Sequence, residues 1–417
     1  MISFRSLQSD CNEKMKIGIL RRLDIWIGRP ICLLLTVAYR IKKIFLHKSP
    51  ISNPRRILFI KLFGMGSIIL AIPAIKAVKK KYPDASLYFL TFKENESLFT
   101  LTDVIPAERV MTVRKDGLFP LITDMFGILN KLVSERIDIV IDFEFFSRFT
   151  AILSFFIRSK YRIGFFGFHT EGLKRGSFID FQINYNHTLH TSKAFFTLLR
   201  PLEITQDEYD PSLPQVPPSE TYLLNVTSLI EKTSGKIETP EKSKKWVVIN
   251  PNTSDLITLR KWPDSHVIEL ARMLVNDKNV EGVIFIGSKA ERPYVQSLCA
   301  SLAGVPDSKI INLAGRTSLR ELIDIFHFAD LIITNDSGPA HLASLTPTPS
   351  IVLFGPETPD LYSPLGPSVS CLYNGLDCQP CVTVYNSKNS YCRDNRCLQL
   401  IRPGDVFVLA NKLSSRH

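Results

Sequence analysis

The sequence predicts an α/β protein with two domains, each built on a parallel sheet covered by helices, that face each other across a cleft. Short buried strands alternate with amphipathic helices from residue 55 onward, which is typical of parallel sheets. A proline-rich stretch at 201–244 interrupts the alternation once, and then the alternation restarts. The chain has 417 residues, which is enough for two such domains.

The first α/β domain is expected at residues 55–200. Its predicted strands cover 56–61, 86–91, 109–113, 137–142 and 162–166. Its first predicted helix ends near residue 81, and two further predicted helices cover 119–136 and 145–157. Strands and helices in this order predict a Rossmann-like domain.

Residues 201–244 are expected to be a linker that is partly helical at 219–232. The second Rossmann-like domain is expected at 245–400, and a C-terminal helix at 401–417. The predicted strands of this second domain cover 246–250, 282–286, 309–313, 331–334 and 350–354. Its predicted helices cover 264–275, 290–302 and 318–328, the last with a capping box from Ser318 to Glu321.

The N-terminal segment, residues 1–54, holds an apolar stretch at 23–39. Asp24, Arg29 and a Gly28–Pro30 break leave an uninterrupted apolar run too short to cross a bilayer of about 30 Å. Basic residues flank the stretch: Arg21, Arg22, Arg40, Lys42, Lys43 and Lys48. These flanks favour an amphipathic helix in peripheral contact with an anionic membrane, with a helix buried against the protein as the alternative.

The formal net charge of +11 favours anionic partners. No basic run with interleaved aromatic residues is present, so nucleic acid is not expected as a partner. Four of the eight cysteines, Cys378, Cys381, Cys392 and Cys397, have C-x2-C-x10-C-x4-C spacing. That spacing suits a structural zinc ion, two disulfides or a set of metal-free thiols.

The stretch 331–345 predicts a strand, a tight polar turn and a helix that has proline in its first turn. Asn335, Asp336, Ser337 and Gly338 form the turn, and His341 lies one helical turn later. Free N–H groups and the helix dipole at such a start can bind a diphosphate. An ordinary strand-to-helix connection capped by Asp336 or Ser337 is the alternative.

The loop after the first strand of the second domain ends in Arg260 and Lys261, just before Trp262. A cation there could hold a phosphate, or the two residues could simply be solvated. A turn that contains Ser288 is followed by Glu291, which could bind ribose hydroxyls or serve as a helix N-terminal charge.

In the first domain, Gly64 and Gly66 form a strand-to-helix turn that lacks the third glycine of a nicotinamide-dinucleotide fingerprint. We therefore expect the turn to approach a sugar instead. Asp142 and Glu144 end a strand and could lie on one face, where either could act as a general base. A helix cap and a salt bridge to Arg148 are the alternative.

Several stretches together resemble glycosyltransferase family 9, the heptosyltransferase family of the GT-B fold, over about residues 55–405. They are RILFIKLFGMGSIILAIPAIKAVKKKYPDA, RKWP, FIGSKAE, ITNDSGPAHLAS and PSIVLFGPETPDLYSPLGP. The resemblance implies an inverting transferase that needs no metal ion or cofactor. It would move a sugar, usually heptose from an ADP donor, to a lipopolysaccharide core at the cytoplasmic face of the bacterial inner membrane.

The resemblance also implies roles for individual residues. Residues 55–200 would be the acceptor domain and 245–400 the nucleotide-sugar domain. Arg260 matches the phosphate-binding position, and Glu291 matches the ribose-binding acid. The remaining donor-binding candidates are Thr253, Ser254, Lys261, Ser288, Asp336, Ser337, Gly338 and His341.

One position departs from the family pattern. The first-domain turn of the family reads Gly-Asp, with the Asp as catalytic base, whereas Ser67 follows Gly66 here. Serine alone is not a base at neutral pH. Either Glu144 or Asp142 supplies the base, or the chain is an inactive nucleotide-sugar-binding scaffold of a glycan assembly complex.

Overall fold

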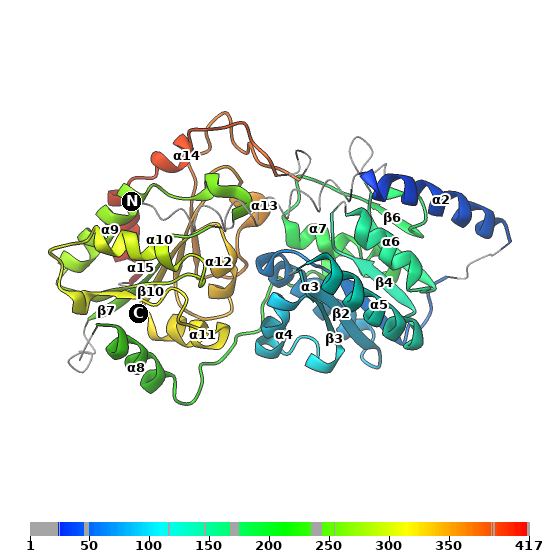
Figure 1. Ribbon diagram of the computed structural model, residues 1–417, viewed down its shortest axis with the longest axis horizontal. Coiled ribbons are helices and arrows are strands. Elements are labelled where there is room, and N and C mark those ends of the chain that lie inside the picture. The colour runs from blue at the N-terminus through cyan, green and yellow to red at the C-terminus, as the bar shows by residue number, and fades with distance from the viewer. Residues whose placement is uncertain are drawn as a thin grey trace. The chain divides into compact units, whose positions relative to one another are not determined.

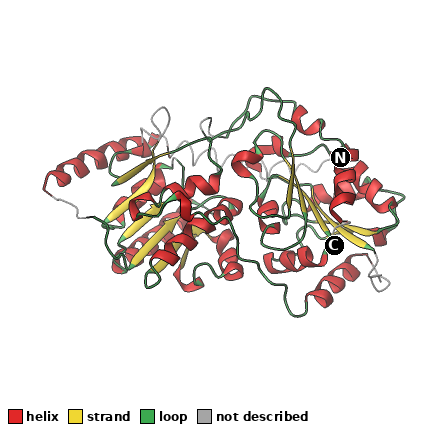
Figure 2. Ribbon diagram, turned by 180° about the vertical axis from the view of Figure 1, so that it is seen from behind, coloured by secondary structure: helices red, strands yellow, loops and turns green. Residues whose placement is uncertain are grey.

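The computed structural model describes residues 24, 26–45, 50–115, 117–145, 147–166, 175–234, 244–253, 255–384, 386 and 388–414. The chain divides into two compact units, Met1–Pro211 (unit 1) and Ser212–His417 (unit 2). Each unit has one six-stranded sheet with helices on both faces (Figures 1 and 2). This arrangement confirms the predicted fold class of two parallel-sheet α/β domains.

The sheet of unit 1 has the order β3-β2-β1-β4-β5-β6, and all of its strand pairs are parallel. Its strands are β1 Arg56–Ile60, β2 Ser86–Phe92, β3 Val110–Val113, β4 Ile139–Asp142, β5 Tyr161–Phe166 and β6 Phe181–Asn184. Its helices are α2 Gly28–Phe45, α3 Met65–Lys81, α4 Glu96–Thr102, α5 Leu118–Ser134, α6 Arg148–Phe156 and α7 Thr191–Thr197.

Successive side chains of β1 point to opposite faces of this sheet, which explains why helices cover both faces. Leu58 and Ile60 pack into a cluster with side chains of α5 and α6. Phe59 points to the other face, where it stacks on Phe143 at 5.5 Å between ring centroids, and Phe143 contacts Phe195 of α7. Both faces of a central strand are therefore buried, as expected for a parallel sheet.

The sheet of unit 2 has the order β12-β11-β10-β7-β8-β9, again with all pairs parallel. Its strands are β7 Lys245–Asn250, β8 Val280–Phe285, β9 Ile310–Asn312, β10 Leu331–Asn335, β11 Ser350–Leu353 and β12 Val369–Leu372. Its helices are α8 Tyr222–Ser234, α9 Asp264–Asn276, α10 Arg292–Ala300, α11 Leu319–Phe328, α12 Gly338–Ala343, α13 Pro359–Tyr362, α14 Arg396–Gln399 and α15 Pro403–Ser414.

The two sheets share one topology. Counted from the first strand of its own unit, each has the order 3-2-1-4-5-6 of dinucleotide-binding folds. The order reverses between the first and fourth strands, which are β1 and β4 in unit 1 and β7 and β10 in unit 2. Ligands of open α/β sheets bind outside the carboxyl ends of the strands at this switch point.

The stretch expected to be a linker divides between the units. Residues up to 211 belong to unit 1, whereas α8 packs against α11 within unit 2. Helix α2 begins inside the N-terminal apolar stretch, extends beyond it to Phe45 and packs against α6. In the part of the chain that the structure describes, no helix has the length and apolar content needed to cross a membrane.

Candidate functional site

In unit 2, the motif residues lie at the switch point. Asn250 ends β7, and its side-chain amide donates to Thr334 Oγ1 at 2.9 Å and to Ser337 Oγ at 3.0 Å. These bonds connect the carboxyl ends of β7 and β10, where the fold places a ligand. Ser337 is the N-cap of α12, but its side chain does not cap the helix because it is bound to Asn250.

Two further asparagines support this edge of the sheet. Asn252 donates to Ile286 O at 2.8 Å, which connects the β7 loop to the end of β8. Asn335 donates to Pro251 O at 3.0 Å and accepts from the Trp262 amide at 3.2 Å. Sequence analysis placed Asn335 in the polar turn but did not single out Asn250 or Asn252. Their positions at or just after the ends of buried strands were the available signal.

Arg260 lies at the centre of a buried group of charges. It ends a 3-10 turn at Asp255–Arg260 (η6), its guanidinium pairs with Glu357, and Nη1 donates to the Asp336 carbonyl at 3.3 Å. Its Nε lies 3.5 Å from Asp336 Oδ2. Glu357 also binds Lys388 Nζ at 3.0 Å. The structure thus brings Arg260 to the Asp336–Gly338 turn.

The charges of this group modify one another. Burial raises the pKa of Asp336 to about 7 despite the opposing charge of Arg260, and the Glu357 carboxylate adds to the rise. Although burial opposes it, the cations of Lys388 and Arg260 lower the pKa of Glu357. Sequence analysis missed Glu357 and Lys388, because pairing between such distant positions depends on the fold.

Lys261 has different neighbours from Arg260. Its ammonium lies 3.2 Å from the centre of the Tyr294 ring and 3.4 Å from Asp264 Oδ1. Burial lowers the pKa of Lys261. Arg260 is therefore the better placed of the two cations for a ligand at the β10 turn.

The turn after β8 forms a closed hydrogen-bonded unit. Glu291 Oε2 accepts from the Ser288 amide at 2.6 Å, and the Glu291 amide donates to Ser288 Oγ at 3.4 Å. Thr253 lies half-buried in the β7 loop, and Ser254 lies outside the described residues. Glu291 thus has the structural role of a turn and helix-start residue.

Helix α12 begins at Gly338 and has six residues. His341 is its fourth residue and is buried. Because the helix dipole sums over aligned peptides, a helix this short offers only a modest field to an anion. The Arg260 guanidinium is the stronger source of positive charge beside this turn.

In unit 1, the glycine turn lies at the corresponding switch point. Gly64 is the N-cap of α3 with φ 83°, a conformation that strongly favours glycine. Gly66 is buried, and Ser67 is the third residue of the helix. The turn lies beside Glu144, which follows β4.

Glu144 is buried and holds this turn in place. One carboxylate oxygen accepts from the Leu62 and Phe63 amides at 2.8 and 3.1 Å. The other binds Lys61 Nζ at 2.9 Å. Glu144 therefore lies where an acceptor-side base is expected, but it already has three protein donors.

Asp142, the last residue of β4, is buried against Arg175. The Arg175 guanidinium also donates to Ser147 O at 2.8 Å and to Phe165 O at 3.2 Å. Burial raises the pKa of Asp142, against the lowering effect of Arg175. The suggested salt bridge between the acidic pair and Arg148 is absent among the described contacts, since Arg148 pairs with Asp24 at 2.9 Å.

The four C-terminal cysteines line one small cavity of about 30 Å³ together with Leu259, Pro356, Gln379 and residues 394–396. No disulfide joins the described cysteines. Within the described ranges, no three cysteine, histidine or acidic side chains are arranged to share a metal ion. Burial raises the pKa of the Cys397 thiol to about 11.

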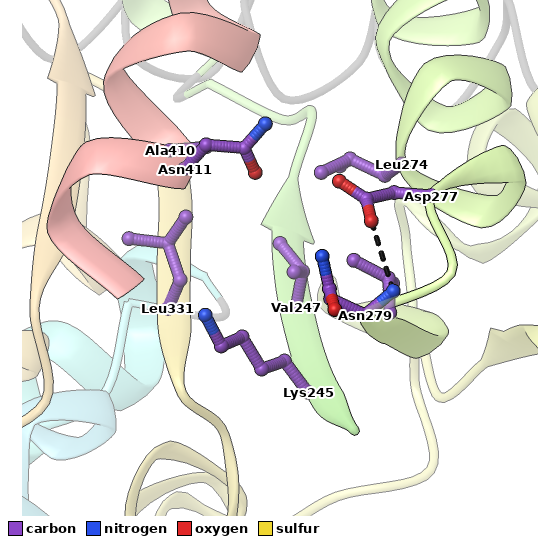
Figure 3. Close-up of a pocket in the computed structure, with 9 residues that line it drawn as sticks. Lys245, Val247, Leu274, Asp277, Asn279, Leu331, Ala410 and Asn411 are labelled. Atoms are coloured by element: carbon purple, nitrogen blue, oxygen red, sulfur yellow. Dashed lines mark hydrogen bonds between the residues drawn. The ribbon is translucent and has the colours of Figure 1, made fainter. Parts of the chain in front are cut away.

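A second cavity, of about 220 Å³, lies at the opposite edge of the unit 2 sheet (Figure 3). Lys245, Val280 and Leu331, the first residues of β7, β8 and β10, line it. It is therefore at the amino ends of the strands, away from the edge where this fold binds nucleotides. It is not part of the candidate site.

Two parallel α/β units with this strand order are the architecture of the GT-B fold, and one of them has a cation and a polar turn at its switch point. The sequence model of glycosyltransferase family 9 (heptosyltransferase) matches residues 125–392, more than half of the chain. The chain therefore belongs to glycosyltransferase family 9, and by that membership it is a glycosyltransferase.

Curated relatives agree with this assignment. Lipooligosaccharide heptosyltransferase 2 of Haemophilus influenzae is 33% identical over 106 residues, which cover 25% of this chain and 30% of that protein. The chain thus matches about a third of the length of this relative. Lipopolysaccharide heptosyltransferase 3 of Escherichia coli is 23% identical over 349 residues, which cover 84% of this chain and 95% of that protein.

Solved structures share the fold. A glycosyl transferase family 9 protein from Veillonella parvula has a TM-score of 0.69 at 20% identity and covers 88% of this chain and 100% of its own. ADP-heptose lps heptosyltransferase II of E. coli has a TM-score of 0.67 at 19% identity, with coverages of 87% and 99%. E. coli heptosyltransferase WaaC with ADP has a TM-score of 0.59 at 17% identity, with coverages of 86% and 99%.

Proposed function

We propose that this chain transfers heptose from ADP-heptose to a lipopolysaccharide core or a related cell-surface glycan. The reaction inverts the anomeric centre and uses no metal ion or cofactor. It takes place at the cytoplasmic face of the bacterial inner membrane, in peripheral contact with its anionic surface. Family membership supports the transferase class, and the names of the relatives, which include an ADP-heptose transferase, support the donor and the acceptor.

One observation carries the donor half of the proposal: Arg260 meets the Asp336–Gly338 turn at the β7/β10 switch point. The guanidinium can offer two parallel N–H groups to a phosphate, and the amides at the start of α12 can add to them. Charge that develops on the leaving diphosphate would be stabilised by groups already in place. Thr253, Ser254, Ser288 and Glu291 are proposed to contact the nucleoside.

The proposed reaction is a single in-line displacement. The acceptor oxygen forms a bond to the anomeric carbon of heptose while the bond from that carbon to the phosphate oxygen breaks. The electron pair leaves with ADP, and the hydroxyl proton passes to a general base. Because the nucleophile attacks opposite the leaving group, the configuration inverts.

We propose Glu144 as that base, with Asp142 as the second candidate. Glu144 follows β4 beside the Gly64–Ser67 turn, and a carboxylate oxygen can accept a further hydrogen bond beyond those it has. Asp142 is less well placed because its carboxylate is paired with the fully buried Arg175. Ser67 is proposed to contact the acceptor hydroxyl and not to take its proton.

The second candidate function is a nucleotide-sugar-binding scaffold without catalysis. Two observations favour it: serine stands at position 67, and three protein donors already bind the Glu144 carboxylate. Such a protein would bind ADP-heptose in unit 2 and leave the acceptor unmodified.

The test combines donor binding with product analysis. Purified protein is incubated with ADP-heptose and a heptose-deficient core acceptor, and the product is identified by mass spectrometry and by its anomeric configuration. Donor binding is followed separately by thermal stabilisation, since a ligand of the native state raises the melting temperature. We expect Glu144→Gln to lose transfer by about a hundredfold or more while donor stabilisation persists.

Two results would change this assignment. If Asp142→Asn in a folded protein loses transfer and Glu144→Gln does not, Asp142 is the base. If the native chain binds donor without forming product, and Ser67→Asp gains transfer, the scaffold function is correct.

A further inference from the structure

Helix α2 has two apolar faces, and the described residues of unit 1 bury only one of them. Cys32 and Tyr39 are buried in a cluster with Ala151 of α6 and with Phe178 and Ile179. An apolar stripe along a helix normally packs against another part of the protein.

The second face consists of large side chains exposed to solvent. Leu34, Val37, Ile41 and Ile44 recur at helical spacing, and Leu33 extends the same face. Trp26, just before the helix, is 79% exposed. We call Trp26, Leu33, Leu34, Val37, Ile41 and Ile44 the outer face of α2.

Specific polar contacts hold α2 in this orientation. The Asp24 carboxylate pairs with Arg148 at 2.9 Å and accepts from the Phe149 amide at 2.9 Å at the start of α6. The Ser177 amide donates to Thr36 Oγ1 at 3.0 Å. Gly28 permits the close approach, because a Cβ there would lie 2.9 Å from Arg148 Cβ. The outer face is thus presented by a fixed helix.

Charge indicates what covers the outer face. Between Gly28 and Phe45 the helix contains Arg29, Arg40, Lys42 and Lys43 and no acidic residue. A second copy of the chain docked through this face would bring the cations of two helices together, and they would repel. An anionic bilayer offers opposite charge to the basic residues and an apolar layer to the outer face.

We propose that α2 docks on an anionic lipid surface through its outer face. Its apolar side chains enter the boundary between headgroups and acyl chains, and its basic residues contact lipid phosphates. The proposal names the contact surface for the peripheral association proposed above, and depends on the proposed function only for its biological setting. Binding to lipid needs no donor, acceptor or transfer.

Trp26 provides a native probe of docking. The chain has three tryptophans, and the other two, Trp246 and Trp262, are buried. The full-length protein is titrated with phosphatidylcholine vesicles that contain about one quarter phosphatidylglycerol. We expect tryptophan emission to shift to shorter wavelength and to be quenched by brominated acyl chains. Trp26→Phe should abolish both signals while vesicle flotation persists.

Two sets of substitutions separate the apolar and the charged contributions. Leu34→Gln, Val37→Gln and Ile41→Gln together should weaken flotation by about tenfold or more. Arg40→Gln, Lys42→Gln and Lys43→Gln together should weaken it by about a hundredfold on the anionic vesicles. Leu224→Gln with Val408→Gln is the matched control, since both side chains are exposed but lie in unit 2, and it should float like the native chain.

Several results would overturn the proposal. In one, the native chain does not float with the anionic vesicles; in another, it binds pure phosphatidylcholine vesicles equally well. In a third, the control variant loses as much flotation as the outer-face variant. A lipid-free dimer that Leu34→Gln, Val37→Gln and Ile41→Gln convert to monomer would show that a second copy covers the face instead. If flotation occurs as expected and no heptose is transferred, the docking proposal stands and the proposed function fails.

Discussion

Arg260 and Glu357 form a buried ion pair at the carboxyl end of the unit 2 sheet, and Glu357 shares its other oxygen with Lys388. The Glu357 carboxylate therefore pairs with both cations, and the Asp336 carboxylate lies 3.5 Å from the Arg260 guanidinium. A donor diphosphate that binds Arg260 must share the guanidinium with Glu357. The pair thus contributes both to the stability of unit 2 and to the affinity of the proposed donor site.

Replacing Glu357 by Gln should destabilise unit 2. The change removes the carboxylate that pairs with both Arg260 and Lys388, and breaking one side of a buried pair costs about 3–5 kcal/mol. The free energy of unfolding is measured by urea denaturation.

Glu291→Gln is the matched control for this substitution. Glu291 is only half-buried and its contacts are within its own turn, so the same chemical change there should cost less than about 1 kcal/mol. Equal losses at the two positions would show that Glu357 does not hold the charge group together.

Arg260→Ala should weaken binding of ADP-heptose by roughly tenfold or more, because a charged hydrogen bond contributes about 1.5–3 kcal/mol. Lys261→Ala is the comparison, since that ammonium lies against Tyr294 and Asp264. Affinity is measured by calorimetry. A larger loss with Lys261→Ala would assign the phosphate to Lys261.

Asp142→Asn should destabilise unit 1 by about 3–5 kcal/mol, because it leaves Arg175 charged and buried without its partner. Asp124→Asn is the matched control, because Asp124 pairs with the exposed Arg114. The same change there should lower the stability of unit 1 much less. Thermal unfolding of the two variants is compared. Equal stability of the two would mean that water reaches Arg175.

Asp336 should make unit 2 less stable as pH rises from about 4 to about 7. Its pKa rises from 3.8 to about 7 on folding, so the folded state holds an extra proton in this window. The stabilisation is full below the unfolded pKa and is lost as pH rises through the folded pKa. The difference in unfolding free energy between native protein and Asp336→Asn, measured across this range, should follow that slope; a flat difference would contradict the raised pKa.

The sequence predicted the central strands well because both faces of a parallel sheet are buried and the strands read as apolar runs. The edge strands β6 and β12 were missed. Their residues, Phe181–Asn184 and Val369–Leu372, are short and mostly half-buried, so they have no apolar run. Short segments of mixed polarity gain strand geometry only from a neighbour that the sequence does not reveal.

The site was predictable where its residues are close in sequence. The strand–turn–helix around Asp336–Gly338 appears where the sequence placed it, and Arg260 reaches this turn. Glu357 and Lys388 were not predictable, since they meet Arg260 only after β11 and the cysteine-rich loop have folded. Nor could the sequence show that Arg260 and Lys261, adjacent in the chain, have separate partners.

Asp24 binds the first turn of α6, the helix that follows Glu144 by only a few residues, and Arg175 joins Asp142 to the carbonyl of Ser147 just before that helix. Docked α2 would therefore fix the height of the acceptor-side carboxylates above the bilayer through contacts inside unit 1 alone. Whatever movement unit 2 makes during turnover, a lipid-anchored glycan would meet these residues at a constant distance from the headgroups. The distance from the headgroups to these carboxylates would then set the length of glycan that reaches them.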